Sequence, residues 1–171
     1  MVGEDDKMDK GFGSIIDESI NLELNVSRLY AVFYNAFEED EDFWWKLTLE
    51  EKNHAALIRS GKSYFRTINR FPEKLLHDRL EDLMGINERL VSLIEEFKGN
   101  PPSREQAFNL AYRIENSAGE LHFQEFMERE PGSKIDEIFQ QLNRNDVEHG
   151  KRIRHYMKEH GIQLHSGQDH I

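Results

Sequence analysis

Four stretches of the sequence carry apolar residues at alternating intervals of four and three, and an acidic residue, with or without a histidine, interrupts each stripe. This alternation places the residues of a stripe on one face of an α-helix. The interrupting residues are Glu23 in the first stripe, Glu51 and His54 in the second, Glu115 in the third, and Asp146 and His149 in the fourth. The sequence therefore predicts long helices that turn charged side chains toward a common core, where an uncompensated charge is costly.

Prolines and glycines are concentrated at a few breaks, which favours an all-α fold over a sheet with many turns. The predicted helices cover about residues 15–37, 42–69, 72–98, 103–130 and 134–160, with Ser14 and Ser103 as N-caps. They are expected to form a four-helix bundle of two antiparallel helical hairpins, with a long helical crossover between helices 2 and 3. Outside the bundle, which covers residues 14–161, we expect a polar, mobile leader at 1–13 and a polar, disordered tail at 162–171.

Composition argues against several classes of function. The net charge of −11 disfavours non-specific nucleic-acid binding, which needs a basic surface. The sequence contains no cysteine, which excludes disulfides, thiolate metal sites and cysteine nucleophiles. The first ten residues lack the apolar stretch of a secretory signal, and no run of about 18 apolar residues could span a membrane. We therefore expect a soluble, cytoplasmic protein without a nucleic-acid or membrane partner.

Two acid–histidine pairs, Glu51 with His54 and Asp146 with His149, have a spacing of three residues. On a helix this spacing puts both side chains on one face, about 5–6 Å apart, so that both can reach one metal ion. Such pairs also arise by chance in a chain rich in acidic residues, so their position on apolar stripes carries more weight. The stripes contain no lysine or arginine, and two divalent cations would offset the four carboxylates.

The depth of the acidic residues gives an independent check. In an antiparallel hairpin, residues equidistant from the turn lie side by side. Glu23 and Glu51 are centred on residue 37, beside an acidic turn. Glu115 and Asp146 are centred between residues 130 and 131, at the turn that contains Pro131 and Gly132. The two residues of each pair then lie at the same level of the hairpin. At a rise of 1.5 Å per residue, this level is roughly 18–24 Å from the loop that joins the two helices. The spacing predicts that these side chains meet.

One glutamate on a helix and an acid-x-x-His pair on the next, repeated twice, is the ligand pattern of di-iron carboxylate bundles. Over residues 15–160 the chain resembles the ferritin-like superfamily, nearest to the rubrerythrin-related proteins. In that group a tyrosine follows the first-helix glutamate by seven residues, as Tyr30 follows Glu23 here. The resemblance implies a ferritin-like bundle with two metal ions, iron or else manganese or zinc, bound by Glu23, Glu51, His54, Glu115, Asp146 and His149.

The resemblance also implies a function. Glu51 and Glu115 would bridge the two ions, and each ion would take one histidine and one terminal carboxylate. Dioxygen or peroxide would be the substrate of a ferroxidase-like or peroxidase-like oxidoreductase. Two other functions stay open: a non-catalytic metal-binding or structural bundle, and a metal-free interaction protein.

The sequence departs from the family pattern at several positions. Asp146 stands where the family has glutamate, and Ala118 stands where true rubrerythrins have an extra glutamate. His122 replaces the tyrosine expected seven residues after Glu115, and we expect it to be a hydrogen-bond partner of a ligand or an additional ligand. Without cysteine there is no iron–sulfur domain, so the peroxidase activity of true rubrerythrins is not carried over.

Some residues keep a structural interpretation beside the functional one. The acid–histidine pairs could lie on the surface, and Glu120 could take the place of Glu115. Tyr30 is expected to be a core tyrosine hydrogen-bonded to a carboxylate, with a redox role as the alternative. The aromatic run at 43–45 is expected to pack in the core and near a loop, or to anchor a homodimer contact.

Overall fold

The protein is all-helical over residues 4–61, 73–121 and 134–165, the part of the chain that this computed structural model describes. Its helices are α1 (Glu4–Ala36), α2 (Glu41–Gly61), α3 (Glu73–Gly99), α4 (Arg104–Leu121) and α6 (Lys134–Glu159), with a short 3₁₀ helix η1 (Glu38–Asp40) between α1 and α2. The predicted all-α class is confirmed. None of the described helices combines the length and apolar character that a bilayer crossing requires.

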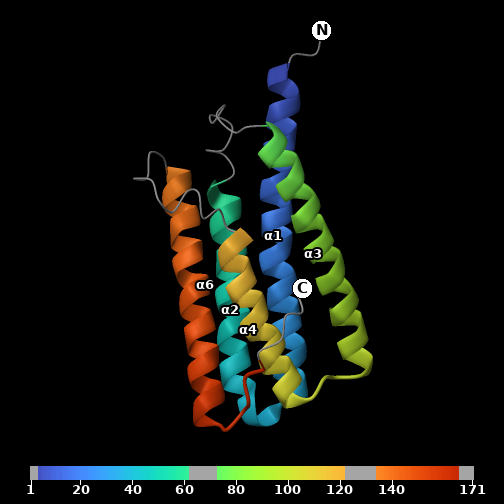
Figure 1. Ribbon diagram of the computed structural model, residues 1–171, viewed down its shortest axis with the longest axis vertical. Coiled ribbons are helices and arrows are strands. Elements are labelled where there is room, and N and C mark those ends of the chain that lie inside the picture. Colours follow the sequence, from blue (N-terminus) through green and yellow to red (C-terminus); the bar gives the residue numbers. More distant parts are fainter. Residues whose placement is uncertain (1–3, 62–72, 122–133, 166–171) are drawn as a thin grey trace.

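The helices form a bundle in which two antiparallel pairs lie side by side (Figure 1). Helix α1 packs along α2, α4 packs along α6, and α2 and α6 join the two pairs. Helix α3 packs against α1 and runs the length of the molecule, which carries the chain back to the end where α4 begins. The inner faces of the two pairs therefore surround one shared interior.

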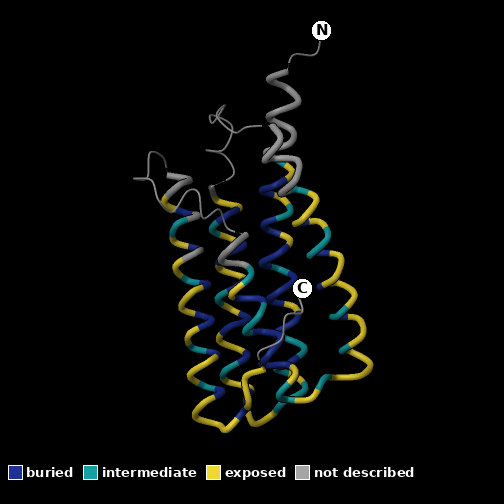
Figure 2. The backbone as a smooth tube through the Cα atoms, viewed as in Figure 1, coloured by how far each residue is buried: buried dark blue, intermediate teal, exposed yellow. Residues whose placement is uncertain are grey.

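Over the residues whose burial the structure describes, the stripes predicted from the sequence face this interior (Figure 2). Leu47, Ile58, Leu142 and Ile153 are almost completely buried, and each lies on a stripe that also carries an acidic residue and a histidine. Burial of large aliphatic side chains contributes about 1.5–3 kcal/mol each, which makes the apolar part of the stripes the main source of stability. The polar members of the stripes are held inside by the packing on both sides of them.

Three hydrogen bonds, two of them buried, fix how α1 meets its neighbours. Ser27 donates to the backbone carbonyl oxygen of Thr48 at 2.9 Å, which sets the level of α1 against α2. On the other side of α1, Asn25 donates to the side-chain oxygen of Asn87 at 2.9 Å, and Asn87 donates to the carbonyl oxygen of Glu18 at 2.9 Å. Buried polar groups that satisfy one another in this way specify one register between helices.

The first helix begins earlier than predicted. Helix α1 starts at Glu4, so Ser14 lies inside it and is not its N-cap, and residues 4–13 extend the helix beyond the predicted start at 15. The leader was predicted from its polarity, but it contains no proline and starts with acidic residues, which favour a helix N-terminus. Its glycines cost about 1 kcal/mol each, which lowers helix propensity without ending a helix.

The other helix ends that the structure describes agree more closely with the ends predicted from the sequence. The capping box at Ser103 is confirmed: Gln106 N–H donates to Ser103 Oγ, and Ser103 N–H donates to Gln106 Oε1. The predicted ends of the second and third principal helices, at 69 and 130, lie outside the described residues. Helix α6 ends before Gly161, whose φ of 66° suits glycine and lets Ile162 N–H donate to the carbonyl oxygen of Met157.

Residues 162–165 lie against α4. The Asn109 side chain donates to the carbonyl oxygen of Gln163 at 2.8 Å and accepts from the N–H of His165 at 2.7 Å. Ile162 is buried beside this contact. This part of the predicted disordered tail is therefore held by an amide side chain that binds the backbone at two points.

Candidate metal centre

The six side chains proposed from the sequence lie together in the interior of the bundle. They come from α1 (Glu23), α2 (Glu51 and His54), α4 (Glu115) and α6 (Asp146 and His149). Each is no more than 5% exposed. The structural alternative of solvent-exposed acid–histidine pairs is therefore wrong.

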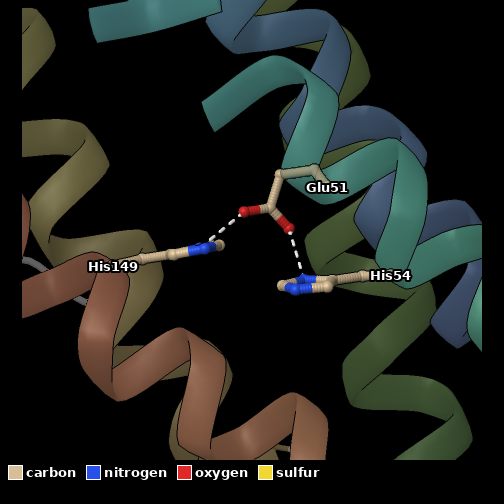
Figure 3. Close-up of side chains that lie close together, drawn as sticks. All are labelled: Glu51, His54 and His149. Carbon is tan, nitrogen blue, oxygen red and sulfur yellow. Dashed lines mark hydrogen bonds and ion pairs between the residues drawn. The ribbon is translucent and has the colours of Figure 1, made fainter. Parts of the chain in front are cut away.

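Glu51 lies between the two histidines (Figure 3). Its Oε2 is 3.1 Å from His54 Nδ1, and its Oε1 is 2.8 Å from His149 Nδ1. The two imidazole rings are nearly parallel, with centroids 5.2 Å apart and an interplanar angle of 12°. One carboxylate thus turns a different oxygen to each histidine, which is the arrangement required to bridge two cations.

The other three carboxylates flank this pair. Glu23 Oε2 lies 3.4 Å from His54 Nδ1, and Glu115 Oε2 lies 3.4 Å from His149 Nδ1. Asp146 Oδ1 is 3.9 Å from His54 Nδ1. Each histidine therefore has Glu51 and one further glutamate in direct contact, and the structure repeats the single-Glu and acid–histidine pattern of the two hairpins.

Two overlapping groups of these side chains bring three ligand atoms within 4.8 Å of one another. One group is Glu51, His54 and His149, and the other is Glu115, Asp146 and His149. All members are buried, and each offers a carboxylate oxygen or an imidazole nitrogen. Oxygen and imidazole donors suit iron, manganese and zinc, so the chemistry of the donor set fits these metals. These buried clusters could hold a metal ion.

The electrostatics of the cluster favour added positive charge. Burial alone would lower the pKa of His54, but its contacts with Glu23 and Glu51 outweigh burial and raise that pKa to about 11. Burial would also lower the pKa of His149, but its contacts with Glu115 and Glu51 outweigh burial and raise that pKa to about 10. Burial and the charge of Glu115 raise the pKa of Glu51 to about 7. Four carboxylates face two imidazoles here, so negative charge is in excess.

The far side of each imidazole has its own partner, which the sequence interpretation missed. His149 Nε2 lies 3.2 Å from Glu50 Oε2, and Arg152 binds Glu50 through both terminal nitrogens, at 2.5 and 3.1 Å. Burial would raise the pKa of Glu50, but the hydrogen bond and charge of Arg152 lower it. Glu50 is thus an anion that can accept the Nε2 proton of His149, which leaves Nδ1 free to bind a metal.

His54 has a neutral partner in the equivalent position. Asn145 Nδ2 lies 3.1 Å from His54 Nε2. An amide can present either its NH₂ or its oxygen, so Asn145 can satisfy both tautomers of this imidazole. Glu50 and Asn145 each precede a candidate ligand in the sequence, and this adjacency is the one local signal that could have pointed to them.

The Nε2 side of the histidines opens to the surface. A pocket of about 490 Å³ lies between α2 and α6, and its lining includes Glu50, His54, Asn145, His149 and Arg152. Exposed Glu148 and Lys151 stand at its edge. This pocket brings solvent to the outer edge of a centre whose carboxylates are buried.

Tyr30 contacts the centre directly. Its hydroxyl donates to Glu115 Oε1 at 2.5 Å, while Oε2 of the same carboxylate faces His149. Burial and the negative charge of Glu115 raise the pKa of Tyr30 well above its usual value, so it remains a phenol. The predicted core tyrosine bonded to a carboxylate is therefore present. His122 and the side chain of Glu120, the alternatives on this helix, lie outside the described residues.

Comparison with known proteins identifies no relative of this chain. No protein-family model, no curated protein and no solved structure matches it.

Proposed function

We propose that this protein is a two-metal carboxylate protein with a ferritin-like four-helix bundle, in which iron is the preferred metal and manganese or zinc the alternatives. The observation that carries the proposal is the position of Glu51, which offers one oxygen to each of two parallel buried histidines. The two helical pairs and the crossover along α1 support the bundle, since ferritin-like folds join their hairpins by one long crossover.

The six side chains divide naturally between two ions. Glu23 and His54 would hold one ion, Glu115, Asp146 and His149 would hold the other, and Glu51 would be shared by both. Two divalent cations would balance the four carboxylates and allow both imidazoles to be neutral, as metal binding requires. Glu115 is a less complete bridge than the sequence predicts, because one of its oxygens accepts from Tyr30.

Two bound iron ions would supply redox chemistry toward dioxygen or peroxide, which makes an oxidoreductase of the ferroxidase or peroxidase type the proposed activity. The protein's own residues serve this chemistry by fixing charge and protons. Glu50 and Asn145 hold Nε2 of the two imidazoles so that both Nδ1 atoms face the carboxylates. The Tyr30 hydroxyl donates a hydrogen bond to Glu115 Oε1, while the other oxygen of this carboxylate contacts His149. Burial of the carboxylates excludes bulk water from the centre.

A metal-free interaction protein, whose buried acids and histidines form an ion-pair network, and a non-catalytic metal site are the competing functions. The raised pKa values of His54 and His149 favour the first, because two imidazolium cations already offset part of the negative charge. The excess of carboxylates over imidazoles favours metal ions, because a buried anion in excess of its cationic partners is costly.

Metal loading and an oxidation assay separate these functions. The purified protein is stripped with a chelator, loaded with Fe(II) without oxygen, and its metal content per chain is measured before oxygen or peroxide is added. Two irons with rapid growth of near-ultraviolet absorbance support the proposal, and bound metal without oxidation supports a structural site. Failure to bind iron, manganese or zinc leaves the metal-free network.

A matched pair of histidine variants shows whether the binding belongs to this centre. His149→Ala removes a buried imidazole, whereas His155→Ala removes an exposed one on the same helix that pairs with Glu159. We expect metal loss in the first variant and unchanged loading in the second. Equal loading of both would place the metal elsewhere in the protein.

A further inference from the structure

A continuous chain of aromatic rings connects the candidate metal centre with the surface near the end of α6. The ring centroids of Tyr30 and Trp44 lie 5.6 Å apart, and Trp44 lies 4.5 Å from Phe108 and 5.4 Å from Phe43. Both phenylalanines contact Tyr156, at 5.4 Å for Phe108 and 4.2 Å for Phe43. Two parallel routes, each through one phenyl ring, therefore join Trp44 to Tyr156.

The two ends of the chain differ in exposure. Tyr30 is completely buried and binds Glu115 of the centre, whereas Tyr156 is half-buried. Exposed His160 stacks on Tyr156 with ring centroids 4.0 Å apart. The aromatic chain thus begins at a tyrosine that binds a candidate metal ligand, and it ends where a molecule in solution can approach.

Each tyrosine of the chain donates its phenolic proton to a buried carboxylate. Tyr30 donates to Glu115 Oε1 at 2.5 Å, and Tyr156 donates to Asp40 Oδ1 at 2.8 Å. A phenol that loses an electron becomes a strong acid, so its oxidation is easy only where a base can take the proton. Both tyrosines have a carboxylate acceptor in place. The bond of Tyr30 has the length of a strong charge-assisted hydrogen bond, and Asp40 is held toward Tyr156 by Arg104, which donates to both of its oxygens.

Trp44 lies between the two tyrosines in an unusual setting. It is completely buried, and its indole Nε1 has no hydrogen-bond partner among the described residues. Buried tryptophans usually find a partner for this N–H, and an exception calls for an explanation. A phenylalanine would fill an apolar core without leaving a donor unsatisfied, whereas an indole gives up an electron far more easily than a phenyl ring.

We propose that Tyr30, Trp44 and Tyr156 form a relay that carries single electrons between the surface at Tyr156 and the metal centre. Phe43 and Phe108 lie between Trp44 and Tyr156, and each of the two phenyl rings contacts both of them. The relay rests on the proposed oxidoreductase function and adds a route for its electrons, because a redox-active centre needs a path for the electrons it consumes.

The transfer is balanced in electrons and protons. Tyr30 gives one electron to the oxidised centre and its phenolic proton to Glu115, and both are restored when Trp44 gives an electron to Tyr30. Trp44 recovers its electron from Tyr156, whose proton passes to Asp40. A small one-electron donor in solution, such as ascorbate, reduces Tyr156, which takes its proton back. One electron moves inward, and no proton is gained or lost.

A photochemical experiment on the metal-free protein tests the relay. Because the sequence has no cysteine, His160→Cys creates a single thiol beside Tyr156 that can carry a ruthenium polypyridyl label. A light flash in the presence of a soluble electron acceptor, hexaammineruthenium(III), converts the label to ruthenium(III), which takes an electron from Tyr156. We expect a radical on Tyr30, detected by electron paramagnetic resonance and transient absorbance and lost in the Tyr30→Phe variant of the labelled protein.

Variants along the chain locate the path. Tyr156→Phe and Trp44→Phe keep an aromatic ring at each position and are expected to abolish the Tyr30 radical. Trp45→Phe changes an exposed indole that contacts Tyr34, outside the chain, and is expected to leave the radical unchanged. Circular dichroism checks that each variant is folded, and the half-buried Tyr156 makes its variant the safer test if Trp44→Phe unfolds.

The outcomes separate the relay from the metal centre. Absence of a Tyr30 radical in the labelled protein, or an equal yield in Tyr156→Phe and Trp45→Phe, overturns the relay and makes the aromatic chain a packed core. The photochemistry needs no metal, so a relay that works in a protein unable to bind iron would leave the relay standing and remove the proposed oxidoreductase function.

Discussion

Glu51 Oε1 lies 2.8 Å from His149 Nδ1, across the interface between α2 and α6. The other oxygen of the same carboxylate contacts His54 on its own helix. The Glu51 side chain thus joins the two helical pairs through a buried polar contact and turns one oxygen toward each histidine.

Removal of the Glu51 charge should lower the number of metal ions that the centre binds. Glu51→Gln keeps the size of the side chain but replaces an anion by a neutral amide, which is a poor metal ligand. We expect the metal content after dialysis to fall from two ions per chain to one or none, measured by elemental analysis. Glu148→Gln removes an exposed carboxylate on α6 and serves as the control. Equal metal content in both variants would rule out Glu51 as the shared ligand.

Metal binding should release protons and tighten as the pH rises. The metal-free imidazoles have pKa values raised to about 11 for His54 and about 10 for His149, so both carry a proton on the face of the centre at neutral pH. A metal ion must displace these protons, so its apparent affinity should rise about tenfold per pH unit for each proton released. Calorimetry in buffers with different ionisation enthalpies measures the released protons. Binding that is independent of pH would contradict this.

Glu50 should tune the affinity of the His149 side without binding metal itself. Glu50→Gln weakens the acceptor at His149 Nε2 and frees Arg152, and loss of such a partner typically costs about 10–100-fold in metal affinity. A competition titration with a chelating dye measures this change. Lys151→Ala, at the edge of the same pocket, should leave the affinity unchanged. A weakening of similar size in both variants would mean that pocket charge, and not the bond to His149, controls binding.

Asn87 should contribute to stability without affecting the centre. Asn87→Ala removes the partner of Asn25 and the donor to Glu18 at the α1–α3 contact, which should cost about 1–3 kcal/mol of unfolding free energy. Urea denaturation measures the loss, and metal loading should be unchanged. Ser92→Ala, at an exposed position on α3, should change stability little. Equal stability of the two variants would show that the buried amide pair does not hold α3 in place.

The sequence by itself determined which residues face the interior and at what level they lie. A helix has 3.6 residues per turn whatever surrounds it, so the stripes through Leu47 and Leu142 could be followed residue by residue. Antiparallel pairing about a turn then set Glu23 beside Glu51 and Glu115 beside Asp146. The burial of these four carboxylates in the structure agrees with that spacing. Whether they hold metal stays a prediction.

Only the tertiary structure decided which groups meet between helices. The contacts of Glu50 with Arg152 and His149, and of Asn145 with His54, depend on how far α2 and α6 are rotated about their own axes. No local pattern encodes that rotation, because it results from packing the whole interior at once. The early start of α1 at Glu4 was missed for a related reason: polarity was taken as a sign of a mobile leader, although polar residues can form a helix.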